Sequence, residues 1–334
     1  MTESQQLADA LQTLQNLQND GILAIKSSRD LRESDRTSLL KAGYIQQVIK
    51  GWYVATSPDV RPGDTTPWYS TFWGFCAQYF EEKYGDGWSL SSEQSIQIHV
   101  GENSVPKQVL VRSPKAGDKV TQLLFETSVY DLRSQIAPDD ELEIQDGLRI
   151  YRLPIALIEA APTFFRKHPL AAKSALGAIR SASELLPKLL AGRHSTIAGR
   201  LCGAFRNINA SGIADEIKNA MTSAGFEIRE TNPFSTDQDF KVTSKNPKAI
   251  RIQMMWQEMR ESVIPIFPKA PGKIADTEAY LKHVEDVYKS DAYHSLSIEG
   301  YKVTPELIEK VRSGEWAPDD DEADEKERLS LIHI

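Results

Sequence analysis

The sequence has few cysteines and no long apolar run. Cys76 and Cys202 are the only cysteines among 334 residues, and neither lies in a histidine-rich cluster, so neither a disulfide framework nor a zinc module is expected. No segment reaches the eighteen or more uncharged apolar residues of a membrane helix, and the first thirty residues lack a basic-then-apolar export signal. We therefore expect a cytoplasmic protein without a membrane partner, and the length favours two or three domains.

The sequence also lacks the common catalytic motifs. It contains no G-x-x-x-x-G-K-[ST], G-x-G-x-x-G, G-x-S-x-G or H-E-x-x-H pattern, each of which sets phosphate-binding amides, a nucleophile or metal ligands at a fixed spacing. The six histidines are scattered, and none is paired with another at metal-ligand spacing. We therefore assign no catalytic residue, cofactor-binding residue or metal ligand within this chain.

Charge is unevenly distributed along the chain. The net charge is −8, but residues 315–328 alone carry eight carboxylates against two basic side chains. Residues 166–206, in contrast, contain eight lysines and arginines against one acid, Glu184. Such a basic segment is either a nucleic-acid footprint that releases counterions or a set of solvated helix faces, and composition leaves both open.

The first 56 residues have the pattern of a winged helix-turn-helix. Leucines at three- and four-residue steps predict a first helix, and Ser34 is the predicted N-cap of a second. Two alternating runs then predict strands joined by a Lys50-Gly51 turn. The predicted elements are helices over 5–17 and 34–43 and strands over 22–25, 44–49 and 52–55.

A winged helix of this kind would contact DNA through its second helix and its hairpin. Arg36, Thr37 and Lys41 would lie on the recognition helix, and Lys50 would lie on the wing. Winged helices also serve as protein-docking modules, and only a handful of cations face the expected groove. DNA is therefore a possible partner at this point, beside a protein.

The rest of the chain is predicted to form further segments, so that the fold class is α+β and multidomain. In the middle we expect a helix over 68–84, strands over 96–100, 109–111, 122–125 and 148–153, and then mostly helix over 155–228. A helix or strand is expected over 250–259, and a long helix over 275–299. The predicted segments are a winged helix-turn-helix (1–56), a mixed α/β domain (57–155), a helical segment (156–230), a connector (231–273), a C-terminal helical segment (274–314) and an exposed acidic tail (315–334) that we interpret as a truncation.

A polar motif closes the predicted long helix. Ser295 and Glu299 are four residues apart and share one helix face, and Gly300 ends the helix directly after the carboxylate. A carboxylate at a helix C-terminus opposes the helix dipole. Thr304 is the predicted N-cap of the next helix, and Pro305 occupies its first turn. Glu299 is therefore either an ordinary solvated residue or one that a function keeps in place.

The motif Ser295-x-x-x-Glu299-Gly300 resembles the inhibitory helix of Fic proteins. The resemblance implies that the whole protein transfers AMP from ATP, with Mg²⁺, to a hydroxyl of a target protein, and that Glu299 holds it inactive. The Glu would pair with an arginine of the catalytic loop where the ATP γ-phosphate binds. The loop pattern H-P-F-x-x-G-N-G-R is absent, since His168-Pro169 continues as Leu-Ala-Ala-Lys. We therefore expect an N-terminal portion whose missing partner is the Fic catalytic core.

A second resemblance covers roughly residues 5–230. The run from Arg36 to Tyr53 is similar to the winged-helix start of AbiEi-type antitoxins, and the stretches Pro67–Gly74, Leu90–Ser95 and Val105–Arg112 look like the domain that follows it. This resemblance implies DNA binding or autoregulation. The sequence thus supports two hypotheses, a regulatory N-terminal portion of a Fic-type AMP transferase that Glu299 inhibits, and a non-enzymatic AbiEi-like transcriptional regulator or antitoxin.

Overall fold

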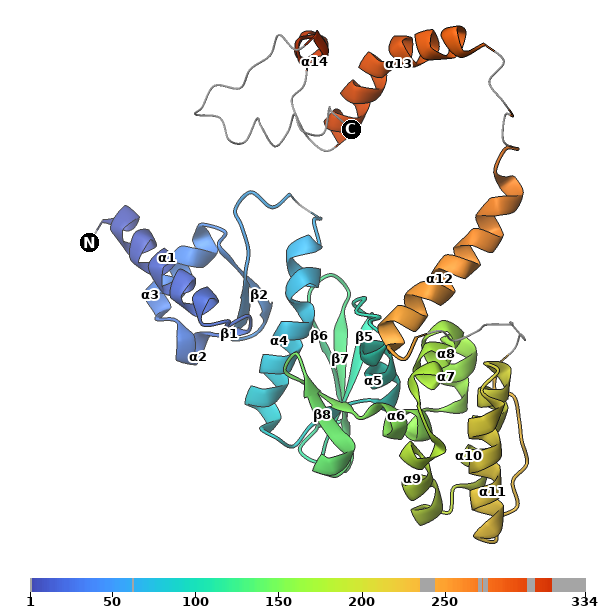
Figure 1. Ribbon diagram of the computed structural model, residues 1–334. Coiled ribbons are helices and arrows are strands. Elements are labelled where there is room, and N and C mark those ends of the chain that lie inside the picture. Colours follow the sequence, from blue (N-terminus) through green and yellow to red (C-terminus); the bar gives the residue numbers. More distant parts are fainter. Residues whose placement is uncertain are drawn as a thin grey trace. The chain divides into compact units, whose positions relative to one another are not determined.

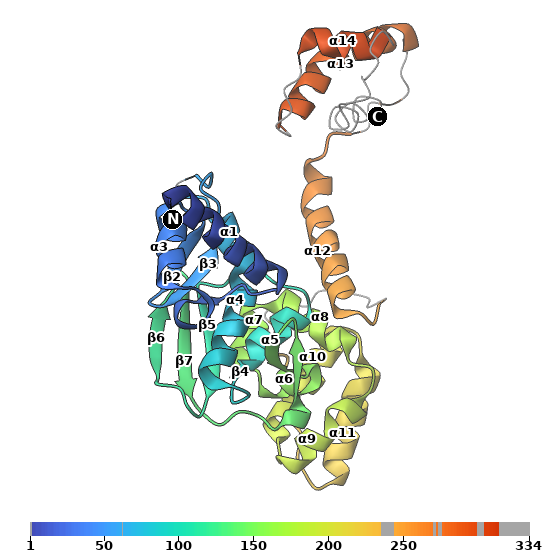
Figure 2. The same cartoon turned by 90° about the vertical axis from the view of Figure 1, so that its left-hand side faces the viewer.

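The computed structural model describes residues 2–61, 63–234, 244–269, 272, 276–298 and 304–313 (Figures 1 and 2). The described part of the chain is a mixed α+β protein with three small sheets. The chain divides into two units, with the boundary between Val263 and Ile264. The finer division into six segments stays a prediction.

The first 55 residues form helices and a small antiparallel sheet. The strands are arranged in the order β1-β3-β2, and the β2–β3 turn is Lys50-Gly51, where Gly51 has a φ of 83°. Leu14, Leu39 and Tyr53 belong to the buried core of this part. The predicted helices and hairpin are therefore confirmed. The elements are α1 (Glu3–Asn19), β1 (Ile25–Lys26), α2 (Ser27–Asp30), α3 (Glu33–Lys41), β2 (Ile45–Ile49) and β3 (Trp52–Ala55).

The prediction that Ser34 caps the second helix is wrong. Helix α3 begins at Glu33 with Arg32 at the N-cap, and no side chain caps it. The hydroxyl of Ser34 instead donates a hydrogen bond to the carboxylate of Asp35 at 3.2 Å. The N-cap position falls two residues earlier than predicted, so Ser34 lies within the first turn of α3.

A long aromatic helix packs against a mixed four-stranded sheet. In the sheet order β4-β5-β7-β6, β5 and β7 are parallel and the other pairs are antiparallel. The predicted helix over 68–84 is confirmed as α4, which buries Trp68, Phe72 and Phe75. The elements are α4 (Thr66–Tyr84), β4 (Ser89–Leu90), α5 (Ser92–His99), β5 (Gln108–Ser113), β6 (Lys119–Gln122), β7 (Ser128–Arg133), η1 (Asp139–Glu141), β8 (Leu142–Gln145) and β9 (Leu148–Tyr151).

Two predicted strands in this region are wrong. Residues 96–99 belong to helix α5, whose N-cap Ser91 accepts a hydrogen bond from the amide of Gln94. Polar and apolar residues of α5 are both buried, so the helical period is hidden in the sequence. At 122–125, strand β6 ends at Gln122, and Phe125 has a φ of 47° in the following turn.

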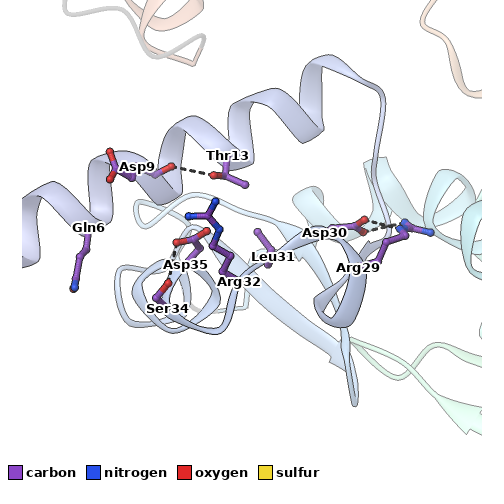
Figure 3. Close-up of a pocket in the computed structure, with 9 residues that line it drawn as sticks. All are labelled: Gln6, Asp9, Thr13, Arg29, Asp30, Leu31, Arg32, Ser34 and Asp35. Carbon is purple, nitrogen blue, oxygen red and sulfur yellow. Dashed lines mark hydrogen bonds and ion pairs between the residues drawn. The ribbon is translucent and has the colours of Figure 1, made fainter. Parts of the chain in front are cut away.

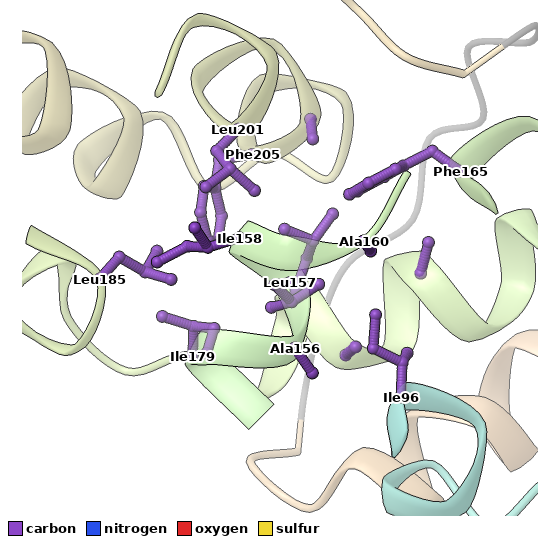
Figure 4. Packing of buried hydrophobic residues seen from close by; sticks show 14 of the residues in the cluster. Ile96, Ala156, Leu157, Ile158, Ala160, Phe165, Ile179, Leu185, Leu201 and Phe205 are labelled. Atoms are coloured by element: carbon purple, nitrogen blue, oxygen red, sulfur yellow. The ribbon is translucent and has the colours of Figure 1, made fainter. Parts of the chain in front are cut away.

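Residues 155–228 are mostly helical, as predicted. Their core is the largest apolar cluster and includes Leu157, Phe165, Leu201 and Phe205 (Figure 4). The helices are α6 (Leu153–Glu159), α7 (Pro162–Lys167), α8 (Pro169–Ala178), η2 (Ala182–Glu184), α9 (Leu186–Ala191), α10 (Ser195–Asn207) and α11 (Ser211–Ser223).

An extended segment lies along α10. The amide of Thr231 donates a hydrogen bond to the carbonyl of Gly199 at 3.1 Å. A Cβ at Gly199 would overlap the carbonyl of Arg229, and one at Gly203 would overlap the carbonyl of Thr231. The two glycines, one helical turn apart, therefore allow the backbone of residues 229–232 to pack directly on the helix.

The last described helices follow this segment. Helix α12 packs on α8, because Ile250 and Met254 are buried against Leu170 and Ala178. In the second unit, α14 begins at Pro305 as predicted. The elements are α12 (Pro247–Val263), η3 (Ile264–Ile266), α13 (Thr277–Ile298) and α14 (Pro305–Ser313).

Candidate nucleic-acid interface and regulatory helix

One face of α3 is solvent-exposed and polar. Leu39 is fully buried and fixes the opposite face of the helix. With 3.6 residues per turn, the side away from Leu39 carries Ser34, Thr37 and Lys41, all of which are exposed. This face offers two hydroxyls and one cation, groups that can bind bases or phosphates.

Both cations predicted on α3 have acidic neighbours. The ammonium of Lys41 lies 2.5 Å from the carboxylate of Glu3 in α1, and this hydrogen bond lowers the pKa of Glu3 and raises the pKa of Lys41. Arg36 is half-buried and lies 3.6 Å from Glu33. Exposed pairs of this kind are weak and screened by salt, so a phosphate could displace Glu3 from Lys41.

The β2–β3 turn adds one exposed cation, Lys50, beside the exposed Gln46 and Gln47 of β2. Residues 1–56 contain six basic and six acidic side chains. These residues, which we call the front end, therefore carry no net positive charge that would attract a polyanion. Any nucleic-acid contact of the front end depends on local groups.

A polar pocket opens beside the start of α3 (Figure 3). Its volume is about 450 Å³. The carboxylate of Asp30 at its edge accepts hydrogen bonds from the Lys26 amide at 2.7 Å and from Arg29 at 2.5 and 2.9 Å. The sequence did not predict this pocket, because α1 and the α2–α3 turn meet only in the fold. The residues lining it are Gln6, Asp9, Thr13, Arg29, Asp30, Leu31, Arg32, Ser34 and Asp35.

The loop between α1 and β1 is bonded to α4. The side-chain oxygen of Gln78 accepts hydrogen bonds from the amides of Leu23 and Ala24, each at 2.8 Å, and its amide nitrogen donates to the carbonyl of Gly21 at 2.8 Å. Glu82, one turn further along α4, pairs with Lys26 at 2.6 Å and with Arg29 at 2.7 Å. These five contacts orient the front end on α4.

Part of the basic segment over 166–206 is used inside the fold. Lys173 and Arg200 are 2% and 9% exposed, and Arg200 donates to the carbonyl of Ala160 at 3.0 Å. Lys188 pairs with Glu141 at 2.6 Å. At least three of the eight cations are therefore unable to form a continuous basic surface.

Arg206 from the same segment belongs to a surface ion-pair network. It pairs with Glu230 at 2.5 Å and with Asp215 at 2.7 Å, and Lys218 approaches Glu230 at 2.9 Å. The hydrogen bonds from Arg206 and Lys218 lower the pKa of Glu230 to about 2. This network ties α10 and α11 to the extended segment, which is a structural role for Arg206.

The predicted regulatory motif begins within α13. Ser295 is within this helix, although its side chain is not among those described. Glu299 and Gly300 lie outside the described residues. On the other side of the motif, a hydrogen bond with its own backbone and one with Thr304 lower the pKa of Glu306 at the start of α14. The motif is thus bounded by two helices.

None of the helices in the described ranges combines the length and apolar character that crossing a bilayer requires. Within those same ranges, no cluster of three or more His, Cys, Asp or Glu side chains is arranged to hold a metal ion.

Comparison with known proteins gives no family. No family model matches the chain, and no curated protein matches it. Among solved structures, the chain is similar to the crystal structure of the RV2827C protein from Mycobacterium tuberculosis, with 14% sequence identity and a TM-score of 0.43. The match covers 74% of this chain and 94% of that chain.

Proposed function

We propose that this chain is the regulatory portion of a Fic-type AMP transferase and that α13 is its inhibitory helix. The observation that supports this is the position of the motif. Helix α13 extends to Ile298, the residue before Glu299, and α14 begins at Pro305. Glu299 follows the last described residue of α13 in the sequence, and in this proposal its carboxylate is directed at one fixed point of the catalytic core. In this proposal the protein is cytoplasmic, and ATP, Mg²⁺ and the target protein bind to the catalytic core.

One carboxylate is sufficient for such inhibition. A desolvated bidentate carboxylate–guanidinium pair costs roughly 3–5 kcal/mol to break from one side. About 2.7 kcal/mol already holds a competing state near one per cent. An arginine paired with Glu299 would therefore leave the γ-phosphate position closed in most molecules.

The test uses the whole protein, in which this chain is joined to its catalytic core. Glu299→Gln removes the charge and keeps the side-chain size, so the transfer of labelled AMP from ATP to protein should rise. Glu278→Gln is the matched control, because Glu278 is exposed at the other end of α13. Equal labelling by the wild type and Glu299→Gln would remove the inhibitory role of α13.

We propose, as a second function, that the front end is a winged helix that binds DNA, as in an AbiEi-like regulator or antitoxin. The element order α1-β1-α2-α3-β2-β3 with the sheet order β1-β3-β2 supports it. Thr37, Lys41 and Ser34 would face the major groove, and Lys50 would contact the backbone. Arg36, half-buried beside Glu33, would act mainly by holding α3.

The DNA proposal is tested by fluorescence anisotropy of the full chain with the DNA upstream of its own gene. Lys41→Ala and Lys50→Ala should each weaken binding and reduce the salt dependence by about one counterion. Glu3→Gln should strengthen binding, because it frees Lys41. Arg166→Ala, an exposed cation elsewhere in the chain, should change nothing. Absent or salt-insensitive binding would contradict the proposal.

A further inference from the structure

Helix α12 carries a row of exposed apolar side chains. Ile252, Trp256, Met259 and Val263 are 63%, 57%, 57% and 45% exposed. Their spacing of four, three and four residues is the heptad spacing of a helix that packs against another helix. Over this length of about 17 Å, the four side chains form one stripe, which we call the α12 stripe.

The α12 stripe lies on the opposite side of the helix from the side that packs on α8. Ile250 and Met254 face α8, and at 3.6 residues per turn the stripe is centred roughly 180° away from them. Figure 1 shows the C-terminal half of α12 extending past α8. On the α8 side this half carries the polar residues Gln257, Glu258 and Glu261, two of which are hydrogen-bonded to each other. The apolar pattern of this half is therefore directed away from α8.

We propose that the α12 stripe is the contact surface for a second copy of this chain, which would place its own α12 alongside as a two-helix coiled coil. Because the attachment to α8 is on the far side of each helix, two copies can approach without obstruction by the residues that hold α12. A stripe with heptad spacing is self-complementary, as a two-fold interface requires.

The exposed apolar area is of the size that a weak, concentration-dependent dimer needs. A half-exposed side chain of this size leaves roughly 100 Å² uncovered. The four side chains of the α12 stripe therefore offer about 400 Å² per copy, or about 800 Å² in the pair, which is in the range of weak, transient interfaces.

The residues beside the α12 stripe do not oppose the pairing. The flanking heptad positions are Gln253, Met255, Arg260 and Ser262, of which only Arg260 is charged. The Arg260 guanidinium lies 5.0 Å from the centre of its own Trp256 ring. In a parallel pair Arg260 would lie opposite Met255 of the second copy, so no two cations would face each other.

The experiment is sedimentation equilibrium of the full chain over a range of concentrations. The wild type should show a concentration-dependent dimer. Trp256→Glu should raise the dimer dissociation constant by about a hundredfold or more, since each dimer contains the change twice. Met259→Glu should act in the same direction and serves as the second variant. The control, Gln257→Glu, adds the same charge one residue away from the stripe and should leave the dimer intact.

Several results would overturn the proposal. A wild type that remains monomeric at the highest concentration reached, with Trp256 protected from oxidation, would show that the same chain covers the stripe. A monomer with Trp256 accessible would leave the second copy without support. A dimer that survives both glutamate variants would place the interface elsewhere. Helical content of each variant is checked by circular dichroism, and loss of dimer in a folded Met259→Glu chain supports the proposal even if Trp256→Glu unfolds.

Discussion

Asp131 is the most deeply buried carboxylate that the structure describes with an ion-pair partner, and it allows a quantitative prediction. It is 2% exposed on β7 and accepts hydrogen bonds from Lys83 at 2.7 Å, from the Tyr84 hydroxyl at 2.6 Å and from the Lys119 amide at 3.1 Å. Burial alone would raise the pKa of Asp131, but these three donors outweigh burial and lower it.

Replacing Lys83 by methionine removes the cation and keeps most of the apolar stem. The carboxylate of Asp131 would then stay buried with only its two neutral donors. Breaking a buried ion pair from one side costs about 3–5 kcal/mol. Because the Lys83 side chain is 28% exposed, the expected loss at neutral pH is at the lower end, about 3 kcal/mol.

The pH dependence of this loss has a defined sign. In the wild type the lowered pKa of Asp131 gives stability that is present above about pH 4 and lost as the pH falls through the folded pKa. Burial raises the pKa of Tyr84 to about 12. Burial alone would lower the pKa of Lys83, but the hydrogen bonds to Asp131 and Tyr84 outweigh it, so the pKa is raised. Those contributions are present below about pH 10 and lost above it. The difference between wild type and Lys83→Met should therefore be largest between pH 5 and about 9 and narrow toward pH 3.

The appropriate assay is hydrogen exchange measured by mass spectrometry on peptides from β5 and β7. It reports the free energy of opening of this sheet, even if the two units of the chain do not unfold in one step. Lys115→Met is the matched control, since Lys115 is exposed and does not pair with Asp131. A loss below about 0.5 kcal/mol that does not vary with pH would mean that the pair acts like a surface salt bridge, and would refute this reasoning.

Two further predictions concern buried positions of the fold. Gly203→Val should displace the backbone at Thr231 and cost about 1–3 kcal/mol by overpacking, whereas Gly212→Ala in α11, with open space around it, should be neutral or stabilising by up to about 1 kcal/mol. Thermal unfolding of the two variants measures the contrast, and equal melting temperatures would contradict it. Burial raises the thiol pKa of Cys76 and, to about 11, that of Cys202. Ellman's reagent should therefore react with neither thiol until urea unfolds the chain, and rapid labelling at pH 8 would be the contrary result.

The sequence predicted the elements that have one apolar face. Helix α1 and the β2–β3 hairpin each bury one side, so their periods of 3.6 and 2 are visible in the residues. Helix α5 was mistaken for a strand because Gln94, Ser95 and Ile96 are all buried. Because polar residues of α5 also face the core, the spacing of its hydrophobic residues alone does not show the helical period.

The sequence predicted part of the candidate nucleic-acid interface on α3, because only some of its features are set by local sequence. Thr37 and Lys41 are placed on the outer side of α3 by the helix period, which is a local property. The acid beside Lys41 comes from Glu3, 38 residues earlier in the chain, and the half-burial of Arg36 depends on how α3 packs. Contacts between distant segments, including the backbone that lies on Gly199 and Gly203, have no signature in local sequence patterns.

The five contacts that Gln78 and Glu82 make with the front end determine how that part of the molecule can be studied and how it can move. A tether of proline and glycine around residues 58–67 would by itself let the front end swing freely, but the amide and carboxylate on α4 hold it. A fragment cut at residue 56 would lose those anchors, and the amides of Leu23 and Ala24 would bond to water instead. A ligand or subunit that reorients α4 would reorient α3 with it, without any change in the tether.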